Sequence, residues 1–167
     1  MYYLEIFSRE LKKIKIGSTI WIIDIDNTVA DTWQTFHSKW SSEKERLSNI
    51  PILQGSVDYI NSKKEKEDMI IYLSARNYFT FDTTYNWLKK YELVQTEKQL
   101  YLVAFPEEKT IFIKKALKNN VKVVYMDDLS HSHELGEAKF YLEVIENIKT
   151  LPITYVDYDY ILKLNKK

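Results

Sequence analysis

The sequence predicts an α/β protein with a doubly wound, mainly parallel sheet of about five strands. Five short segments are apolar enough to be strands, at residues 19–24, 69–74, 99–105, 121–127 and 153–157. Most of them are continuous apolar runs, which is typical of strands that helices cover on both faces. The segments between them have the length and the period of helices, and strands that alternate with helices assemble into parallel sheets.

Two of the intervening segments carry apolar stripes at helical spacing. In residues 109–119 the stripe consists of Phe112, Ile113, Ala116 and Leu117. In residues 137–148 it consists of Ala138, Tyr141, Leu142, Ile145 and Ile148. We therefore predict a helix over each of these segments.

Two further segments are predicted to be helices. Residues 80–91 offer Thr80 or Asp82 as an N-cap, and residues 54–66 have helical length. The run at residues 62–68 mixes both signs of charge and is predicted to be a solvated loop.

Length and composition set the broad class of protein. A chain of 167 residues suits one domain over residues 1–167, and 45% hydrophobic with 14% aromatic content excludes a disordered chain. The 24 basic and 24 acidic side chains balance, so net charge gives no support for a nucleic-acid or membrane partner. Cysteine is absent, which excludes disulfides, thiolate metal sites and a cysteine nucleophile.

The first segment, residues 1–17, does not have the pattern of a signal peptide. Charged residues interrupt it, among them Glu5, Arg9, Glu10 and Lys12, whereas a signal peptide needs an unbroken apolar core. No apolar run in the chain approaches the length of a membrane span. We therefore expect a soluble, cytoplasmic protein.

Two carboxylates, Asp24 and Asp26, end the first predicted strand. Side chains alternate across a strand, so both project to one side while Ile25 points to the other. Neighbouring carboxylates repel each other, and the pKa of at least one should rise unless a cation lies between them. The pair therefore predicts a metal ion, a protonated acid, or both.

Other polar residues follow the predicted strands at the edge where ligands bind in doubly wound sheets. They are Thr28 after the first strand, Ser74 and Arg76 at the end of the second, Asp127 and Asp128 at the end of the fourth, and Lys109, which opens a helix just after Pro106. Taken singly, each has an ordinary explanation as a cap, a turn or a solvated side chain. Their joint occurrence predicts a functional site.

In this order the residues resemble the four motifs of the haloacid dehalogenase superfamily of phosphohydrolases. Asp24-Ile25-Asp26-Asn27-Thr28 is similar to the first motif, Ser74 to the second, Lys109 to the third and Asp127-Asp128 to the fourth. The match runs from about residue 19 to residue 130, and it implies a Rossmann-like fold. Asn27 stands where the family commonly has glycine; asparagine tolerates left-handed backbone better than most residues, so the turn is expected to persist.

The resemblance implies a mechanism in which Asp24 is the nucleophile and forms an aspartyl phosphate. Asp26 would protonate the leaving group and then activate water. Mg²⁺ would be the cofactor, held by Asp24, the main-chain carbonyl of Asp26 and an acid of the pair Asp127–Asp128, which together form an oxygen-only set suited to a hard cation.

The resemblance also implies that Thr28, Ser74 and Lys109 bind the phosphate of a phosphorylated substrate. Lys114 and Lys115 are rivals for the lysine role, but they lie further along the helix and away from the strand ends.

Little of the chain is left for a cap over the site. The interval 74–109 is used by one helix and one strand, and residues 31–54 hold at most a flap and one or two short helices. Family members with a minimal cap commonly act on bulky substrates or borrow cover from a partner subunit. The sequence is therefore compatible with an oligomer.

Within the superfamily, the segment around Ser74 and Arg76 is similar to the 3′-phosphatase domain of polynucleotide kinase/phosphatase proteins. The resemblance implies a nucleic-acid 3′-phosphate or another bulky phosphoester as substrate, with Arg76 binding it. A small metabolite, either a sugar phosphate or a nucleotide, is the alternative, because the net charge does not support a nucleic-acid partner.

Two other classes of protein also gather acidic residues. A D-x-D glycosyltransferase binds a metal with such a pair, but it does not need Ser74, Lys109 and Asp127–Asp128. A phospho-acceptor module has its lysine after the last acidic strand, where residues 153–160 have none. His131 and His133 are interpreted as ordinary loop histidines.

Overall fold

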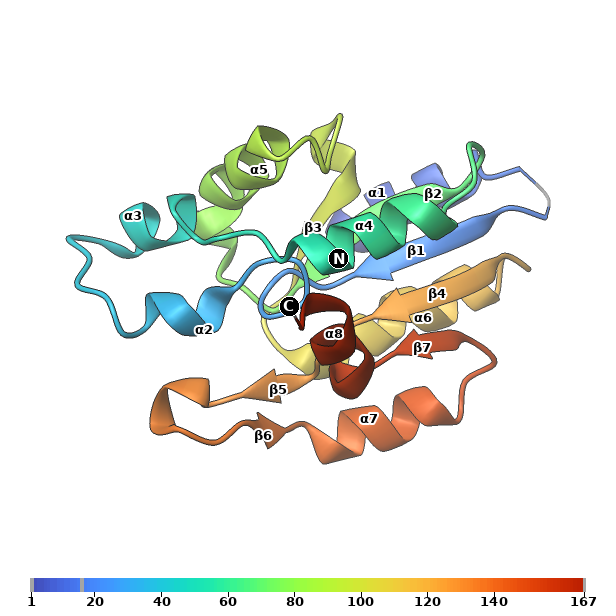
Figure 1. Ribbon diagram of the computed structural model, residues 1–167. Helices are drawn as coiled ribbons and strands as arrows, with labels where there is room; N and C mark the ends of the chain where they lie inside the picture. Colours follow the sequence, from blue (N-terminus) through green and yellow to red (C-terminus); the bar gives the residue numbers. More distant parts are fainter. Residues whose placement is uncertain (1, 16, 167) are drawn as a thin grey trace.

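The computed structural model describes residues 2–15 and 17–166, and it contains a five-stranded sheet in the order β3-β2-β1-β4-β7 (Figure 1). Its strands are β1 (Thr19–Ile23), β2 (Met69–Ser74), β3 (Leu100–Leu102), β4 (Lys122–Met126) and β7 (Thr154–Val156). All neighbouring strands pair in parallel. The predicted doubly wound α/β fold is confirmed.

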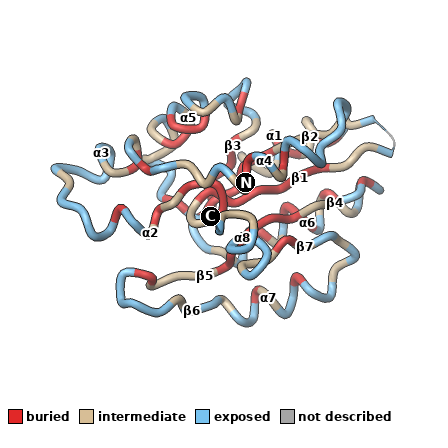
Figure 2. Tube along the Cα trace, viewed as in Figure 1, coloured by how far each residue is buried: buried red, intermediate tan, exposed pale blue. Residues whose placement is uncertain are grey.

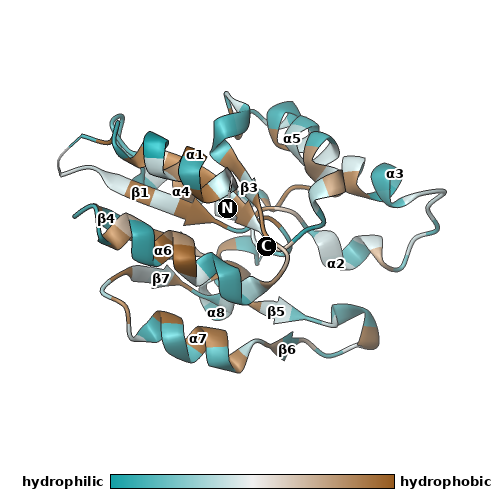
Figure 3. Ribbon diagram, turned by 180° about the vertical axis from the view of Figure 1, so that it is seen from behind, coloured by the Kyte–Doolittle hydropathy of each residue, from teal (hydrophilic) through white to brown (hydrophobic). Residues whose placement is uncertain are grey.

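Helices cover both faces of the sheet (Figures 1 and 3). One face carries α4 (Gln54–Lys63), α5 (Phe81–Lys90) and α8 (Tyr158–Asn165), and the other carries α1 (Tyr2–Leu11), α6 (Lys109–Leu117) and α7 (Leu142–Lys149). Alternation along β1 produces both cores: Trp21 and Ile23 face the first set of helices, whereas Ile20 and Ile22 face the second. The buried stretches in Figure 2 follow these strands.

Helices α1 and α8 are absent from the elements that the sequence pattern predicts. Phe7 and Leu11 of α1 are buried in the core beside α6. Helix α8 begins after Asp157, whose carboxylate accepts the backbone N–H of Tyr160, and it packs on α4. The packing is close at Gly55, where a Cβ would lie 2.0 Å from the carbonyl oxygen of Leu164.

Several predicted boundaries are wrong; the helix predicted over residues 54–66, for example, ends at Lys63. The strand predicted at 99–105 has only three residues in the sheet, because the chain leaves β2 after the N–H of Val103 donates to the Ser74 carbonyl at 3.0 Å. The helix predicted from residue 137 begins at Leu142, because Lys139–Phe140 (β6) pairs with Ser130–His131 (β5) in an antiparallel hairpin. Leu142, assigned to the buried stripe, is 67% exposed.

Short elements project beyond the carboxyl edge of the sheet. Helices α2 (Thr32–Thr35) and α3 (Glu43–Ser48) lie on one side of this edge, and the β5–β6 hairpin lies on the other, at the left of Figure 1. Four 3₁₀ turns complete the described elements, at Tyr78–Thr80 (η1), Glu97–Gln99 (η2), Pro106–Glu108 (η3) and His133–Leu135 (η4).

None of the helices in the described ranges combines the length and the apolar character that crossing a membrane requires.

Candidate catalytic site at the carboxyl edge of the sheet

The turn after β1 places the first two acids. The N–H groups of Val29 and Ala30 both donate to the Ile25 carbonyl, at 3.1 and 2.9 Å, and close the turn. Asn27 has φ +53°, the left-handed conformation expected for this position. Its side-chain oxygen accepts the N–H of Trp33 at 3.0 Å, so the turn also fixes the start of α2.

Lys109 joins the ends of β1 and β4. Its Nζ lies 2.6 Å from Asp24 Oδ1 and 2.7 Å from Asp127 Oδ2, and all three side chains are buried. Lys109 is the first residue of α6, directly after η3, which directs its side chain back toward the sheet. Of the two rivals, Lys114 is exposed and Lys115 is half-buried, whereas Lys109 is buried and contacts the acids.

Three acids lie close enough to share a cation. One carboxylate oxygen from each of Asp24, Asp127 and Asp128 lies within 4.8 Å of the others, and all three residues are buried. With Asp26 they make four acids against two buried cations, Lys109 and Arg76, so the cluster has an excess of negative charge when all four acids are ionised. Carboxylate oxygens are the ligands that Mg²⁺ prefers, and the donor set therefore fits that ion.

The two members of the acidic pair differ in how many partners they already have. Asp127 Oδ2 accepts from Lys109 and from the Tyr125 hydroxyl, and Asp127 Oδ1 accepts the N–H of Leu129 at 2.8 Å. Both Asp127 oxygens are thus occupied by protein donors. Asp128 Oδ2 accepts from the hydroxyl of Ser130.

Burial and repulsion shift the ionisation of the cluster. Burial, helped by the Asp127 and Asp26 charges, holds the pKa of Asp24 well above its usual range, although Lys109 opposes this. Burial also raises the pKa of Asp128. Burial disfavours the Lys109 ammonium, but Asp127 and Asp24 outweigh it and raise the pKa of Lys109. Lys109 therefore stays charged, whereas burial favours the protonated forms of Asp24 and Asp128.

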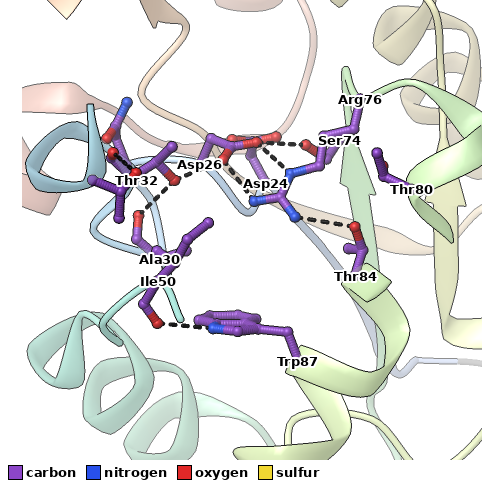
Figure 4. Close-up of polar contacts among 12 residues, drawn as sticks. Asp24, Asp26, Ala30, Thr32, Ile50, Ser74, Arg76, Thr80, Thr84 and Trp87 are labelled. Carbon is purple, nitrogen blue, oxygen red and sulfur yellow. Dashed lines mark hydrogen bonds and ion pairs between the residues drawn. The ribbon is translucent and has the colours of Figure 1, made fainter. Parts of the chain in front are cut away.

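Asp26 is held by Arg76 (Figure 4). The guanidinium Nε donates to Asp26 Oδ2 at 2.7 Å and Nη2 donates to Oδ1 at 2.6 Å, while Nη1 donates to the hydroxyl of Thr84 on α5 at 3.1 Å. The Thr32 hydroxyl adds a hydrogen bond to Oδ1 at 2.6 Å. Burial alone would raise the pKa of Asp26, but Arg76 outweighs it and holds that pKa well below its usual range.

Ser74 and Thr28 are both fully buried but lie differently. The Ser74 hydroxyl donates to Asp26 Oδ2 at 3.3 Å and borders the cavity in front of the acids. The Thr28 hydroxyl accepts the backbone N–H of Asp128 at 3.3 Å, so it ties the turn after β1 to the end of β4.

A small cavity and a groove meet at this edge. The cavity measures about 100 Å³ and is bordered by Asp24, Asp26, Ser74 and Lys109. The groove beside it measures about 310 Å³, and its walls come from α2 and α3 on one side and from residues 130–134 on the other. Residues 31–54 therefore form one wall of the site.

Several polar residues of the site carry no signal in the sequence pattern. Tyr125 holds Asp127 from inside β4, and Thr84 holds Arg76 from the buried face of α5. His133, interpreted as an ordinary loop histidine, is buried against Ser130. Its place five residues after Asp128 was the available clue.

No protein-family model, curated protein or solved structure was found to match this chain. The likeness to the haloacid dehalogenase superfamily therefore rests on the residues of the four motifs.

Proposed function

We propose that this chain is a Mg²⁺-dependent phosphomonoester hydrolase of the haloacid dehalogenase type. The observation that carries the proposal is the Lys109 ammonium, which bridges Asp24 and Asp127 beside a cavity that Ser74 also borders. A carboxylate can attack phosphorus when neighbouring cations and hydroxyls neutralise the phosphoryl oxygens. The order of the four motifs along the chain supports the same assignment.

Asp24 and Asp128, with the main-chain carbonyl of Asp26, would hold the ion. Asp128 is favoured over Asp127 as the direct ligand, because protein donors already occupy both oxygens of Asp127. When bound, Mg²⁺ supplies positive charge that offsets the acids and the phosphate oxygens. Asp127 then has the task of holding Lys109 toward the phosphate.

The proposed reaction has two displacements at phosphorus. In the first, an oxygen of Asp24 attacks, the ester P–O bond breaks, and an aspartyl phosphate forms on Asp24. Because Arg76 keeps Asp26 ionised in the free site, the proton that Asp26 passes to the leaving oxygen would come from the monoanionic phosphate group of the substrate. In the second, a water molecule gives a proton to Asp26 and attacks the same phosphorus, which releases inorganic phosphate and restores Asp24. Arg76 orients the Asp26 carboxylate for the second displacement.

Exposed aromatic rings favour a nucleic-acid 3′-phosphate or another bulky phosphoester as substrate. Phe36, Tyr78, Phe79 and Phe105 lie on segments that follow β1, β2 and β3, and their exposed fractions range from 44% to 77%. The rings of Tyr78 and Phe79 lie 4.1 Å apart between centroids. Exposed rings beside a phosphate site can stack on bases.

The size of the groove favours the second candidate, a phosphatase of small metabolites. A volume of about 310 Å³ suits a sugar phosphate or a mononucleotide. Arg46 borders this groove, and its guanidinium carbon lies 4.9 Å from the centroid of the Phe36 ring. Arg46 could therefore receive a second anionic group of a small substrate.

The test of the reaction is hydrolysis of an aryl phosphate with Mg²⁺ and without any sugar donor. Release of inorganic phosphate by the wild type, and its loss in Asp24→Asn, supports the proposal. No hydrolysis without a sugar nucleotide would favour a glycosyltransferase, and a stable aspartyl phosphate without turnover would favour a phospho-acceptor module.

The test of the substrate compares kcat/KM for a 3′-phosphorylated oligonucleotide and its mononucleotide analogue at two salt concentrations. A higher kcat/KM for the oligonucleotide, with an advantage that shrinks as salt rises, supports a nucleic-acid 3′-phosphate as the substrate. Phe79→Ala should reduce that advantage. Equal values, or a preference for a small sugar phosphate, would establish the metabolite phosphatase instead.

A further inference from the structure

The loop after β4 carries a chain of hydrogen bonds that ends on Asp128. The Ser130 hydroxyl contacts Asp128 Oδ2, and His133 Nε2 lies 2.5 Å from Ser130 Oγ. His133 Nε2 is 3.7 Å from Asp128 Oδ2, too far for a direct hydrogen bond. Asp128 is 3% exposed and His133 is 7% exposed, so these groups satisfy one another inside the protein.

The number of protons available to Asp128, Ser130 and His133 decides which group donates in each of these hydrogen bonds. In the form that binds a cation, Asp128 is ionised and only accepts hydrogen bonds, so in that form the single proton of the Ser130 hydroxyl points at Asp128. The Ser130 oxygen is then left to accept, and His133 must donate to it from Nε2. The contacts therefore require His133 to carry its proton on Nε2.

The backbone of the loop is shaped to make these contacts. Leu129 and Ser132 have φ of +44° and +60°, in the left-handed region that residues other than glycine rarely adopt. The N–H of Leu129 donates to Asp127 Oδ1 at 2.8 Å, which fixes the first of these two turns beside the acids. Such backbone cost persists only where surrounding contacts over-determine it.

The far side of His133 packs on Trp33 of α2. Its ring lies 4.8 Å from that of Trp33, centroid to centroid, and the two planes are nearly perpendicular at 86°. Trp33 belongs to α2 and is itself tied to the turn after β1 through Asn27. His133 is thus fixed between the α2 wall and the Asp128 carboxylate.

We infer that Ser130 and His133 are positioning residues that hold Asp128 in the orientation needed to bind a divalent cation. Ser130 engages Oδ2 and leaves Oδ1 of Asp128 for the ion, and His133 prevents the Ser130 hydroxyl from rotating away. This inference rests on the metal site of the proposed function. Partners of this kind around a metal ligand change metal affinity by about 10- to 100-fold when they are removed.

The experiment measures the Kd for Mg²⁺ by calorimetry, without substrate, in Ser130→Ala and His133→Phe. Phenylalanine keeps a ring against Trp33 but removes the donor. The control is His131→Phe in the same loop, because His131 Nδ1 contacts Ser132 rather than an acid. We expect the Kd to rise about tenfold or more in the first two variants and to stay within about twofold of the wild-type value in the control.

The outcomes separate this inference from the proposed function. Wild-type binding with no change in Ser130→Ala overturns the inference and leaves the metal site standing, whereas no binding by the wild type overturns the metal site itself. If His133→Phe fails to fold by circular dichroism, Ser130→Ala decides. A nitrogen-15 NMR spectrum that shows the His133 proton on Nδ1 alone would also overturn the inference.

Discussion

Arg76 binds both oxygens of Asp26, with Nε donating to Oδ2 at 2.7 Å and Nη2 donating to Oδ1 at 2.6 Å. A two-point contact of this kind fixes the plane of the carboxylate as well as its charge. Arg76 is 9% exposed and also donates to Thr84, so three of its N–H groups are directed at protein. The structure thus gives Arg76 a task that does not depend on substrate.

Arg76→Gln should lower kcat strongly with little change in KM, because the residue orients Asp26. It should also lower the free energy of unfolding by about 3 kcal/mol, since Asp26 loses its main partner. Steady-state kinetics and urea denaturation measure the two effects. Arg46→Gln is the matched control for stability, with an expected loss below about 1 kcal/mol. A raised KM with unchanged kcat would instead make Arg76 a substrate ligand.

Asp24→Asn should keep the fold and lose turnover, because an amide of the same size cannot attack phosphorus. We expect less than about a hundredth of the wild-type rate, which corresponds to about 3 kcal/mol of barrier. Phosphate release measures the activity, and circular dichroism checks the fold. A folded variant that retains more activity would remove Asp24 from the role of nucleophile.

Removal of Mg²⁺ with a chelator should abolish activity, and re-addition should restore it. Asp128→Asn should raise the Mg²⁺ concentration needed for half-maximal activity about tenfold or more. Asp127→Asn should instead mainly destabilise the fold, because Asp127 holds Lys109 and Tyr125. Metal titrations and urea denaturation of both variants make the comparison. The reverse pattern would exchange the roles of the two acids.

Asp68 should make stability depend on pH. Slight burial would raise its pKa, but hydrogen bonds from the N–H groups of Glu65 and Thr19 and from the Trp21 indole outweigh burial and lower it. A lowered pKa in the folded state adds stability above the unfolded pKa, and that stability is lost as pH falls through the folded pKa.

Asp68→Asn should therefore cost about 1 kcal/mol at pH 7. The cost should shrink as the solution is acidified below the ordinary range of aspartate, near pH 4. Urea denaturation at both pH values measures it. Glu67→Gln is the control, because the contact of Glu67 with Lys15 is exposed and contributes little. A cost that is independent of pH would contradict the assignment.

The Tyr101 hydroxyl is a buried polar atom with no hydrogen-bond partner among the described residues. Tyr101→Phe should leave the free energy of unfolding unchanged or raise it by about 1 kcal/mol, because an unsatisfied group is removed. Tyr125→Phe is the contrasting variant, since its hydroxyl holds Asp127, and it should lose about 2 kcal/mol. Equal losses in the two variants would show that Tyr101 has a partner.

The sheet could be predicted because strands that are buried on both faces appear in the sequence as apolar runs, as at residues 20–23 and 70–73. The residues of the four motifs could be placed at one edge because parallel strands share a carboxyl edge. The hydrogen-bond partners of those residues could not be predicted from the sequence. Thr84 and Tyr125 are ordinary helix and strand positions until the fold brings them to Arg76 and Asp127.

The β5–β6 hairpin escaped prediction for a related reason. Its two strands have two residues each, too few for alternation to appear, and the apolar spacing of α7 continues by coincidence to Ala138. The pairing of Ser130 with Phe140 and the hydrogen bond from the Tyr141 N–H to the Leu129 carbonyl decide the backbone there. Both contacts are invisible in a local pattern.

The central position of β1 has a consequence for the rate of folding. Ile20 pairs with Met69 on one side and with Val123 on the other, so β1 gains its neighbours only after two long loops have closed. The acids at the end of β1 and β4 come together in that same step. Their mutual repulsion should therefore slow the closure, and a divalent cation should speed refolding as well as stabilise the folded state.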